Sequence, residues 1–166
     1  MESNKTNISK DVASKKIRVT RQFEAPAEQV WNAWTNSELL DLWWAPKPWK
    51  AQTKKMDFRE GGFWLYAMVG PDGAPSWCRV DYEAIVPLES FTGFDAFCDE
   101  DGNINKDFPT MHWHCEFKET ANGTNVNVDI TFSSEADMQK IVDMGFEEGF
   151  TAAHGNLDEL LQKQVA

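Results

Sequence analysis

Two histidines stand two residues apart in the segment MHWHCE, a spacing at which imidazole groups can hold a metal ion. Residues two apart on a strand point to the same face, so His112 and His114 could bind zinc or iron if a third ligand lay nearby. The opposite face of this segment carries the more apolar set, which is Met111, Trp113, Cys115 and Phe117. We therefore expect the apolar set to point into the protein, and the histidines to lie on the surface without a bound metal.

A second group that could do chemistry combines one arginine with two charged residues farther along the chain. Arg21 interrupts the apolar face of the segment KIRVTRQFE, and a guanidinium on such a face needs a carboxylate partner. We expect Asp57 to be that partner, with Arg59 in the same group, because the two short helices between them could bring their strands together. Two interpretations remain open: a structural ion pair, or a polar group that binds an anion or a carbonyl at a pocket.

The sequence contains no arrangement typical of covalent catalysis. The cysteines Cys78, Cys98 and Cys115 are scattered and odd in number, so they do not predict a disulfide framework. Cys98 lies at a turn without an adjacent base, and no Ser-His-Asp arrangement, nucleophile elbow or phosphate loop occurs. We therefore expect no catalytic residue and no cofactor.

The net charge of −11 restricts the partners of this protein, because nucleic acids and anionic membranes attract clustered Lys and Arg. We expect neither as a partner. No segment is long and apolar enough to cross a bilayer, and the start of the chain lacks the apolar stretch of a signal peptide. With few cysteines, a reduced, cytoplasmic protein is the simplest prediction. Residues 1–15 predict a polar, flexible tail, and residues 16–166 a single domain.

The elements that must position these residues follow from the apolar pattern. Residues 16–24 alternate as a half-buried strand, and the segments APAEQVWNAWT and NSELLDLWW predict two short helices. About six strands with short turns follow between residues 51 and 132, which indicates antiparallel pairing. A helical pattern from Glu135 to about Gln164 closes the chain. A sheet that curls around one long helix leaves a natural pocket between them.

Three glycines lie within that closing helical pattern, at Gly145, Gly149 and Gly155. Each glycine inside a helix costs about 1 kcal/mol relative to alanine, so another effect must compensate for them. Three explanations are open: the helix approaches the sheet closely, it kinks, or it leaves room for a guest molecule.

Several segments together resemble the heat-shock protein 90 ATPase activator homologue family. TRQFEAPAEQVWNAWTNSELLDLWWAP is similar to the family's opening signature, MDFREGGFWLYAMVGPDG to its paired strands and Pro-Asp-Gly turn, and GFEEGFTAAHGNLDELL to its closing helix. The likeness covers roughly residues 17–163. It implies an α+β helix-grip fold, related to START lipid-binding domains: a curved antiparallel sheet of about six to seven strands around a long C-terminal helix, with two short helices after the first strand.

The resemblance also orients the strand of GGFWLYAMVG, because the family has polar residues where Phe63 and Leu65 stand. Alternation then predicts the inward residues of the neighbouring strands, and the closing helix adds two phenylalanines. The predicted pocket lining is Trp64, Tyr66, Met68, Val80, Tyr82, Trp113, Cys115, Val128, Phe146 and Phe150. In the segment LLDLWWAPKPWK, either Trp43 or Trp44 should be buried under the helices, and Trp49 should lie at the pocket rim.

Three functions are compatible with this pattern. The first is binding of a small hydrophobic or aromatic molecule in the pocket. The second is a cyclase- or hydrolase-type enzyme, for which Arg21, Asp57, Tyr66 and Tyr82 are the candidate polar groups. The third is regulation of a chaperone ATPase, which we do not expect, because the relatives that named the family carry an additional chaperone-binding domain. The apolar outward face formed by Phe63, Leu65 and Ala67 also predicts a homodimer.

Overall fold

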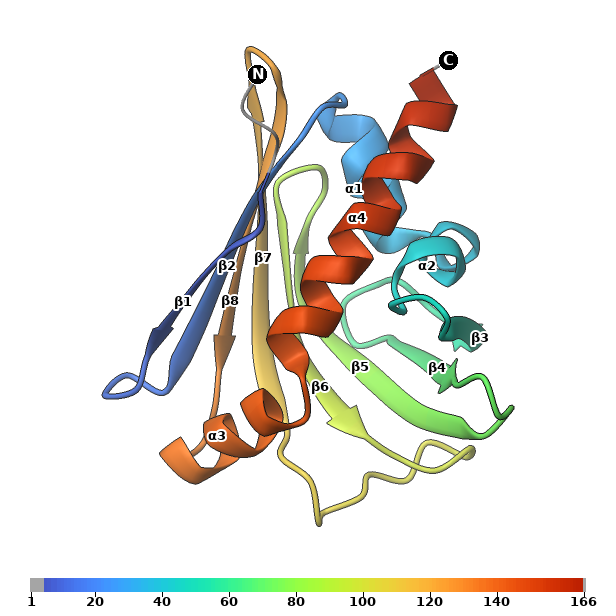
Figure 1. Cartoon of the computed structure of the whole chain (residues 1–166), viewed down its shortest axis with the longest axis vertical. Helices are drawn as coiled ribbons and strands as arrows, with labels where there is room; N and C mark the ends of the chain where they lie inside the picture. Colours follow the sequence, from blue (N-terminus) through green and yellow to red (C-terminus); the bar gives the residue numbers. More distant parts are fainter. Residues whose placement is uncertain (1–4, 166) are drawn as a thin grey trace.

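The computed structural model describes residues 5–165 and shows an open antiparallel sheet whose concave face is covered by helices (Figure 1). Its eight strands lie in the order β1-β2-β8-β7-β6-β5-β4-β3. The strands are β1 (Asn7–Asp11), β2 (Lys16–Phe23), β3 (Lys50–Met56), β4 (Phe63–Val69), β5 (Pro75–Val86), β6 (Ser90–Phe97), β7 (Met111–Thr120) and β8 (Gly123–Thr131). The helices are α1 (Ala27–Thr35), α2 (Ser37–Trp43), α3 (Glu135–Asp143) and α4 (Phe146–Val165). The predicted α+β helix-grip fold is confirmed, with eight strands where about six to seven were expected.

Alternating side chains explain why the sheet has one apolar face. β2 pairs with β8 so that Val19 lies opposite Val128, and both are buried beneath the helices. The residues that alternate with them along each strand point outward. Among these, Arg18 on β2 donates a hydrogen bond of 2.7 Å to Asp129 on β8. The period of two thus separates an apolar concave face from a charged convex face.

The first strand corrects the prediction of a flexible tail over residues 1–15. Asn7–Asp11 form β1, which pairs antiparallel with β2 at the edge of the sheet. Thr6 is held by a hydrogen bond of 2.8 Å between its Oγ1 and Nδ1 of the buried His154 on α4. Residues 1–4 of the predicted tail lie outside the described residues. β1 was missed because its side chains are mostly polar and exposed, so periodicity gave no signal.

The two helices after β2 form as predicted, and Asn36 caps α2 by accepting a hydrogen bond of 2.9 Å from the backbone N–H of Glu38. Trp43 is the fully buried member of the tryptophan pair, and its Nε1 donates to the carbonyl of Ala33 at 2.9 Å. Adjacent helical residues point in different directions, so the ring of Trp44 does not point the same way as that of Trp43. Instead it lies over β4, where its Nε1 reaches the hydroxyl of Tyr66.

The closing helical pattern contains a break, which corrects the expectation of one helix from Glu135 to about Gln164. α3 ends before Met144, and Gly145 adopts a φ of +89°, a conformation that side chains with a Cβ rarely adopt. α4 then begins at Phe146 and crosses the concave face of the sheet (Figure 1). The kink is therefore the explanation that applies to Gly145.

The outward face of β4 was expected to expose an apolar patch, but its residues are buried or half-buried in the structure. Leu65 and Ala67 are buried within the chain, and Phe63 is half-buried beneath two cations. The guanidinium carbon of Arg79 lies 4.9 Å from the centre of the Phe63 ring, and Nζ of Lys55 lies 5.4 Å from it. The exposed apolar surface that suggested a homodimer is thus covered, and the homodimer itself stays a prediction. Within residues 5–165, no helix has the length and apolarity needed to span a membrane.

Candidate functional site

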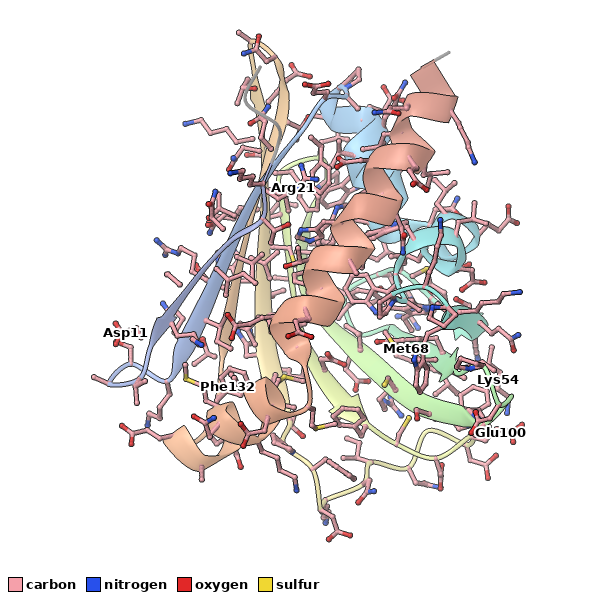
Figure 2. The ribbon with its side chains drawn as sticks, viewed as in Figure 1. Asp11, Arg21, Lys54, Met68, Glu100 and Phe132 are labelled. Atoms are coloured by element: carbon pink, nitrogen blue, oxygen red, sulfur yellow. The ribbon has the colours of Figure 1, made fainter. Side chains whose placement is uncertain are left out.

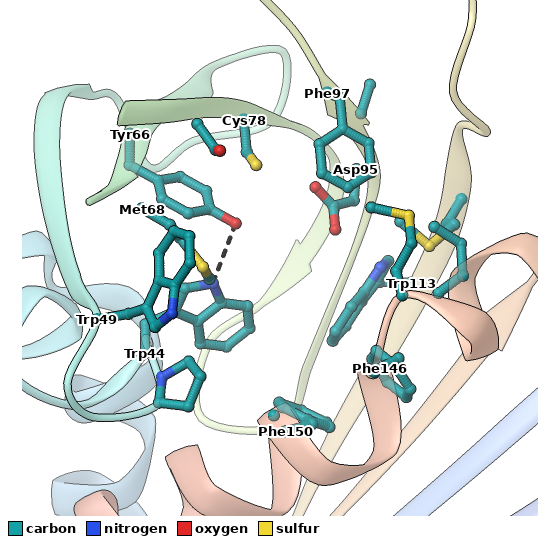
Figure 3. A pocket seen from close by; sticks show the side chains of 18 residues that line it. Trp44, Trp49, Tyr66, Met68, Cys78, Asp95, Phe97, Trp113, Phe146 and Phe150 are labelled. Atoms are coloured by element: carbon teal, nitrogen blue, oxygen red, sulfur yellow. Dashed lines mark hydrogen bonds between the residues drawn. The ribbon is translucent and has the colours of Figure 1, made fainter. Parts of the chain in front are cut away.

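An open pocket of about 400 Å³ lies between the sheet and the α3–α4 region (Figure 3). Strands β4 to β7 provide one wall, and the end of α3 with the first turns of α4 provides the opposite wall. The segment that joins α2 to β3 closes one side through Trp44, Pro46 and Trp49. The volume lies within the range of about 300–1,000 Å³ typical of small-molecule sites.

Aromatic rings dominate the lining. The aromatic lining residues are Trp44, Trp49, Tyr66, Phe97, Trp113, Phe146 and Phe150. Six residues predicted from the sequence lie in this wall, namely Trp49, Tyr66, Met68, Trp113, Phe146 and Phe150. Trp49 lines the pocket and is 40% exposed.

The other five predicted lining residues lie elsewhere on the concave face, and they are Trp64, Val80, Tyr82, Cys115 and Val128. Alternation oriented them inward correctly, but at Tyr82 aromatic side chains of α1 and of the β3–β4 turn fill the concave face. Trp31 of α1 packs edge-to-face on Phe58, and Phe58 packs in the same way on Tyr82 with ring centres 4.7 Å apart. These five residues are outside the pocket lining, and the concave face at Tyr82 is closely packed.

Arg21, Asp57 and Arg59 do not form the predicted polar group at the pocket. Arg21 is buried on β2 and pairs with Asp158 of α4, and its Nη1 donates to the carbonyl of Gln22 at 2.9 Å. Asp57 instead accepts a hydrogen bond of 2.7 Å from Nε of Arg59 at the exposed β3–β4 turn. Figure 2 shows Arg21 well away from Met68, which lines the pocket. The predicted pairing with Asp57 was wrong because the partner comes from the helix, which lies against β2.

The sequence interpretation missed Asp95 on β6, whose carboxylate points into the pocket (Figure 3). Among residues 5–165 it has no hydrogen-bond or ion-pair partner, and burial raises its pKa to about 7. Alternation puts Asp95 on the same strand face as Phe91, but the opposite face carries Phe94, so the burial of Phe91 in the structure is what identifies the inward face. A carboxylate on the apolar face of a strand without an obvious partner indicates a functional position.

Two further polar groups in the wall are neutral near pH 7. The Tyr66 hydroxyl accepts a hydrogen bond of 3.0 Å from Nε1 of Trp44, drawn as the dashed line in Figure 3. Burial, together with the nearby Cys78 and Asp95, raises the pKa of Tyr66 well above its usual value. Burial likewise raises the pKa of the Cys78 thiol far above its usual value. Asp95 is therefore the group in this wall that changes its charge near neutral pH.

Small residues on the helical side keep the pocket open. Gly145 and Gly149 line it, and a Cβ at Gly149 would lie 3.7 Å from Cγ of Pro46, which also lines the pocket. Asn156, two turns farther along α4, donates hydrogen bonds to the backbone carbonyls of Trp43 and Ala45 at 3.4 and 3.0 Å. The helix thus fixes the segment that carries Trp44 and Pro46, while its glycines leave space beside it.

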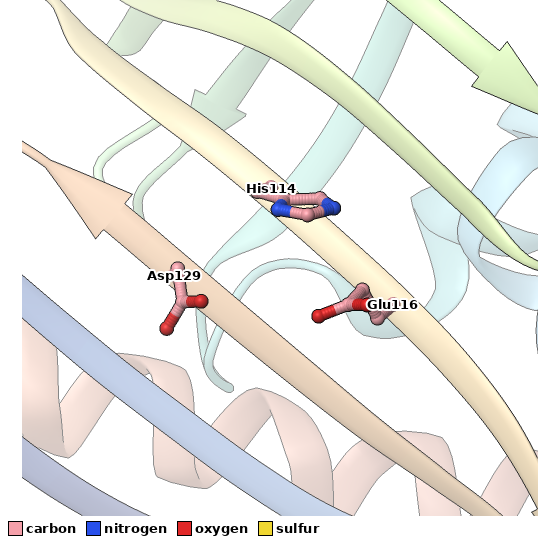
Figure 4. A group of neighbouring side chains, drawn as sticks. All are labelled: His114, Glu116 and Asp129. Carbon is pink, nitrogen blue, oxygen red and sulfur yellow. The ribbon is translucent and has the colours of Figure 1, made fainter.

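The histidines of MHWHCE lie on the convex face, as predicted. His114 and Glu116 of β7 and Asp129 of β8 have potential ligand atoms within 4.8 Å of one another (Figure 4). Asp129 is already paired with Arg18, and His112 pairs with Glu83 at 3.0 Å instead of joining the group. Acidic and imidazole groups on an exposed sheet face are common without a metal, so this cluster carries no functional argument.

These features define a helix-grip domain with an open, aromatic-lined pocket that contains one unpaired carboxylate. Residues 24–162 match the family described as Activator of Hsp90 ATPase homolog 1-like protein, and the chain belongs to this family. A search of curated proteins finds no match.

Solved structures of bacterial proteins share the fold over nearly the whole chain. Protein Ms6760 from Mycobacterium smegmatis is 31% identical with a TM-score of 0.87, over 94% of this chain and 96% of that protein. A protein from Arthrobacter aurescens is 30% identical with a TM-score of 0.89, over 95% and 91% of the two chains. A protein from Staphylococcus epidermidis is 28% identical with a TM-score of 0.83, over 95% and 94%.

Proposed function

We propose that this protein binds a small, mainly apolar or aromatic molecule in the pocket between the sheet and α4. The observation that carries the proposal is a space of about 400 Å³ with a largely aromatic wall, in a region that protein interiors normally fill. Trp44, Trp113 and Phe150 offer flat apolar faces to a guest molecule. The family and the fold are compatible with such binding.

Titration with N-phenylnaphthylamine, a neutral apolar dye that fluoresces in dry sites, tests this proposal. We expect saturable binding to the wild type, and loss of at least about ten-fold in affinity for Gly149→Leu, because the new side chain occupies the pocket. Gly155→Leu is the matched control, since Gly155 lies on the same helix, outside the pocket, with open space around its Cβ position. Equal affinity of the wild type and Gly149→Leu would contradict the proposal.

A second candidate, acid–base catalysis in the same pocket, is favoured by Asp95 alone. A carboxyl group whose pKa is about 7 is matched to proton transfer at neutral pH. The base-catalysed ring opening of nitrobenzisoxazole reports on a base in an apolar pocket, because it requires only removal of a carbon-bound proton. Turnover that is abolished by Asp95→Asn would support this candidate, and a rate equal to that of free acetate would count against it.

The third candidate, regulation of a chaperone ATPase, is supported by the family description alone. We expect no stimulation of the chaperone's ATPase by this protein, and a steady-state ATPase assay with added protein would test that expectation.

A further inference from the structure

The pocket contains a negative charge that the protein itself does not neutralise. Asp95 has no hydrogen-bond or ion-pair partner in the part of the chain that the structure describes. Neither Lys, Arg nor His is among the residues that line the pocket. The Asp95 carboxylate therefore lies among apolar groups with one side open to whatever enters (Figure 3).

An unpaired carboxylate in apolar surroundings is costly for a protein to maintain, because ionisation there loses the solvation that water provides. Two other charged groups with restricted exposure avoid that cost by pairing. Arg21, although buried, has Asp158, and Arg79 donates to both oxygens of Asp81 at 2.9 and 2.5 Å. Asp95 has no such partner among residues 5–165, and it lies in the pocket, which indicates that its partner comes from outside the chain.

The rings around Asp95 suit a cation as well as an apolar body. Trp44, Trp113 and Tyr66 line the same space, and the faces of such rings attract ammonium groups that come within about 6 Å of their centres. We propose that the natural ligand of this pocket is a small apolar or aromatic amine, whose protonated nitrogen pairs with Asp95. This inference rests on the proposed function and adds the chemical class of the ligand.

An ammonium fits the site better than a neutral hydroxyl for an electrostatic reason. A hydroxyl would donate one hydrogen bond to Asp95 and leave the negative charge in the pocket. A protonated amine donates a hydrogen bond and also cancels that charge, so the complex as a whole becomes neutral in its apolar surroundings. The net charge of −11 adds a general attraction for cations and repels anionic ligands.

Three probes that share an indole ring and a two-carbon side chain separate these possibilities: tryptamine, tryptophol and indoleacetate. They end in an ammonium, a hydroxyl and a carboxylate. By calorimetry at about pH 8, where Asp95 is ionised, we expect tryptamine to bind at least about ten-fold more tightly than tryptophol. Indoleacetate should bind more weakly than both.

Two variants show whether Asp95 causes the preference. In Asp95→Asn, which is nearly isosteric, the affinity for tryptamine should fall at least about ten-fold and become similar to that for tryptophol. Glu148→Gln removes the same charge from an exposed position on α4 outside the pocket, so it should leave the preference in place.

Equal binding of tryptamine and tryptophol, or an unchanged preference in Asp95→Asn, would overturn the amine inference. Failure of tryptamine to bind a protein that still binds N-phenylnaphthylamine would overturn it as well, while leaving the pocket proposal in place. If neither tryptamine nor the dye binds, both the amine inference and the proposed function are contradicted.

Discussion

The indole nitrogen of Trp44 donates a 3.0 Å hydrogen bond to the hydroxyl of Tyr66, and this bond joins the end of α2 to β4 at the pocket wall. The two residues come from different elements, and their rings define one side of the space. Trp64 supports the arrangement from behind, because its ring stacks on Tyr66 with centres 3.9 Å apart. The wall is therefore preorganised by contacts within the protein, without a ligand.

Removing the Tyr66 hydroxyl tests how much this bond contributes. In Tyr66→Phe the half-buried N–H of Trp44 loses its acceptor, so we expect the free energy of unfolding to fall by about 1–2 kcal/mol in denaturant titrations. Tyr82→Phe is the matched control, because the described residues offer the Tyr82 hydroxyl no hydrogen-bond partner. It should change stability by less than about 0.5 kcal/mol. Similar losses in both variants would show that the bond is unimportant.

Ionisation of Asp95 should lower the free energy of unfolding at neutral and alkaline pH. Its pKa is raised to about 7 in the folded protein from an ordinary value of 3.8, so the folded state binds the proton more tightly than the unfolded state. Ionisation therefore destabilises the fold progressively as the pH rises from about 4 to about 7. We expect Asp95→Asn to be more stable than the wild type by roughly 1–3 kcal/mol at about pH 8, with the gain lost near pH 4. If Asp95→Asn is less stable than the wild type at both pH values, the raised pKa of Asp95 in the folded protein is contradicted.

His154 should act in the opposite direction over a similar pH range. Burial, with a contribution from Arg21, lowers its pKa from 6.5 to about 3, so the unfolded state binds the proton more tightly. Stability is therefore lost as the pH falls from about 6.5 toward 3. Relative to His154→Gln, the wild type should lose roughly 1–3 kcal/mol between about pH 7 and pH 4. A pH-independent difference between the two proteins would mean that the pKa of His154 is the same in the folded and unfolded states.

Substitutions of Trp49 and Trp43 should have different effects on ligand binding and on stability. Trp49 is 40% exposed at the pocket rim, so Trp49→Ala should weaken dye binding and change the free energy of unfolding by less than about 1 kcal/mol. Trp43 is fully buried, and Trp43→Ala should cost about 3–5 kcal/mol. If Trp49→Ala unfolds the protein instead, Trp49 belongs to the core and its role as a rim residue is wrong.

The affinity for an amine should depend on pH through Asp95. The other titratable groups of the pocket wall, Tyr66 and Cys78, have pKa values raised far above neutrality and stay uncharged. The ionised fraction of Asp95 rises about ten-fold between pH 6 and pH 8, so tryptamine affinity should increase by about the same factor, measured by calorimetry. In Asp95→Asn the affinity should be flat over this range, and a flat profile in the wild type would contradict the pairing.

The sequence predicted the fold because the signals for it are local. Alternation over β2 and β8, the cap at Asn36 and the short turns each follow from a few neighbouring residues. The break at Gly145 was one of three explanations that the sequence left open, and its positive φ decides among them.

The pocket was predicted less completely, because its extent depends on tertiary packing. Alternation predicted that both Tyr66 and Tyr82 point inward. Phe58 and the α1 rings fill the space in front of Tyr82, whereas the space in front of Tyr66 is part of the pocket. Asp95 was missed because SFTGFDAF has apolar residues on both faces, so its period did not decide which face is inward. The curvature of the sheet and the position of α4 supply that information.

The indole N–H resonances of the eight tryptophans provide the most direct test of ligand binding in this pocket. In heteronuclear NMR spectra with added tryptamine, we expect shifts of the indole resonances of the pocket residues Trp44, Trp49 and Trp113. The buried Trp43 and the outward-facing Trp77 should be unaffected, and Asp95→Asn should reduce the shifts at the same tryptamine concentration. Shifts spread evenly over all the tryptophans, or confined to Trp77, would contradict the pocket as the binding site.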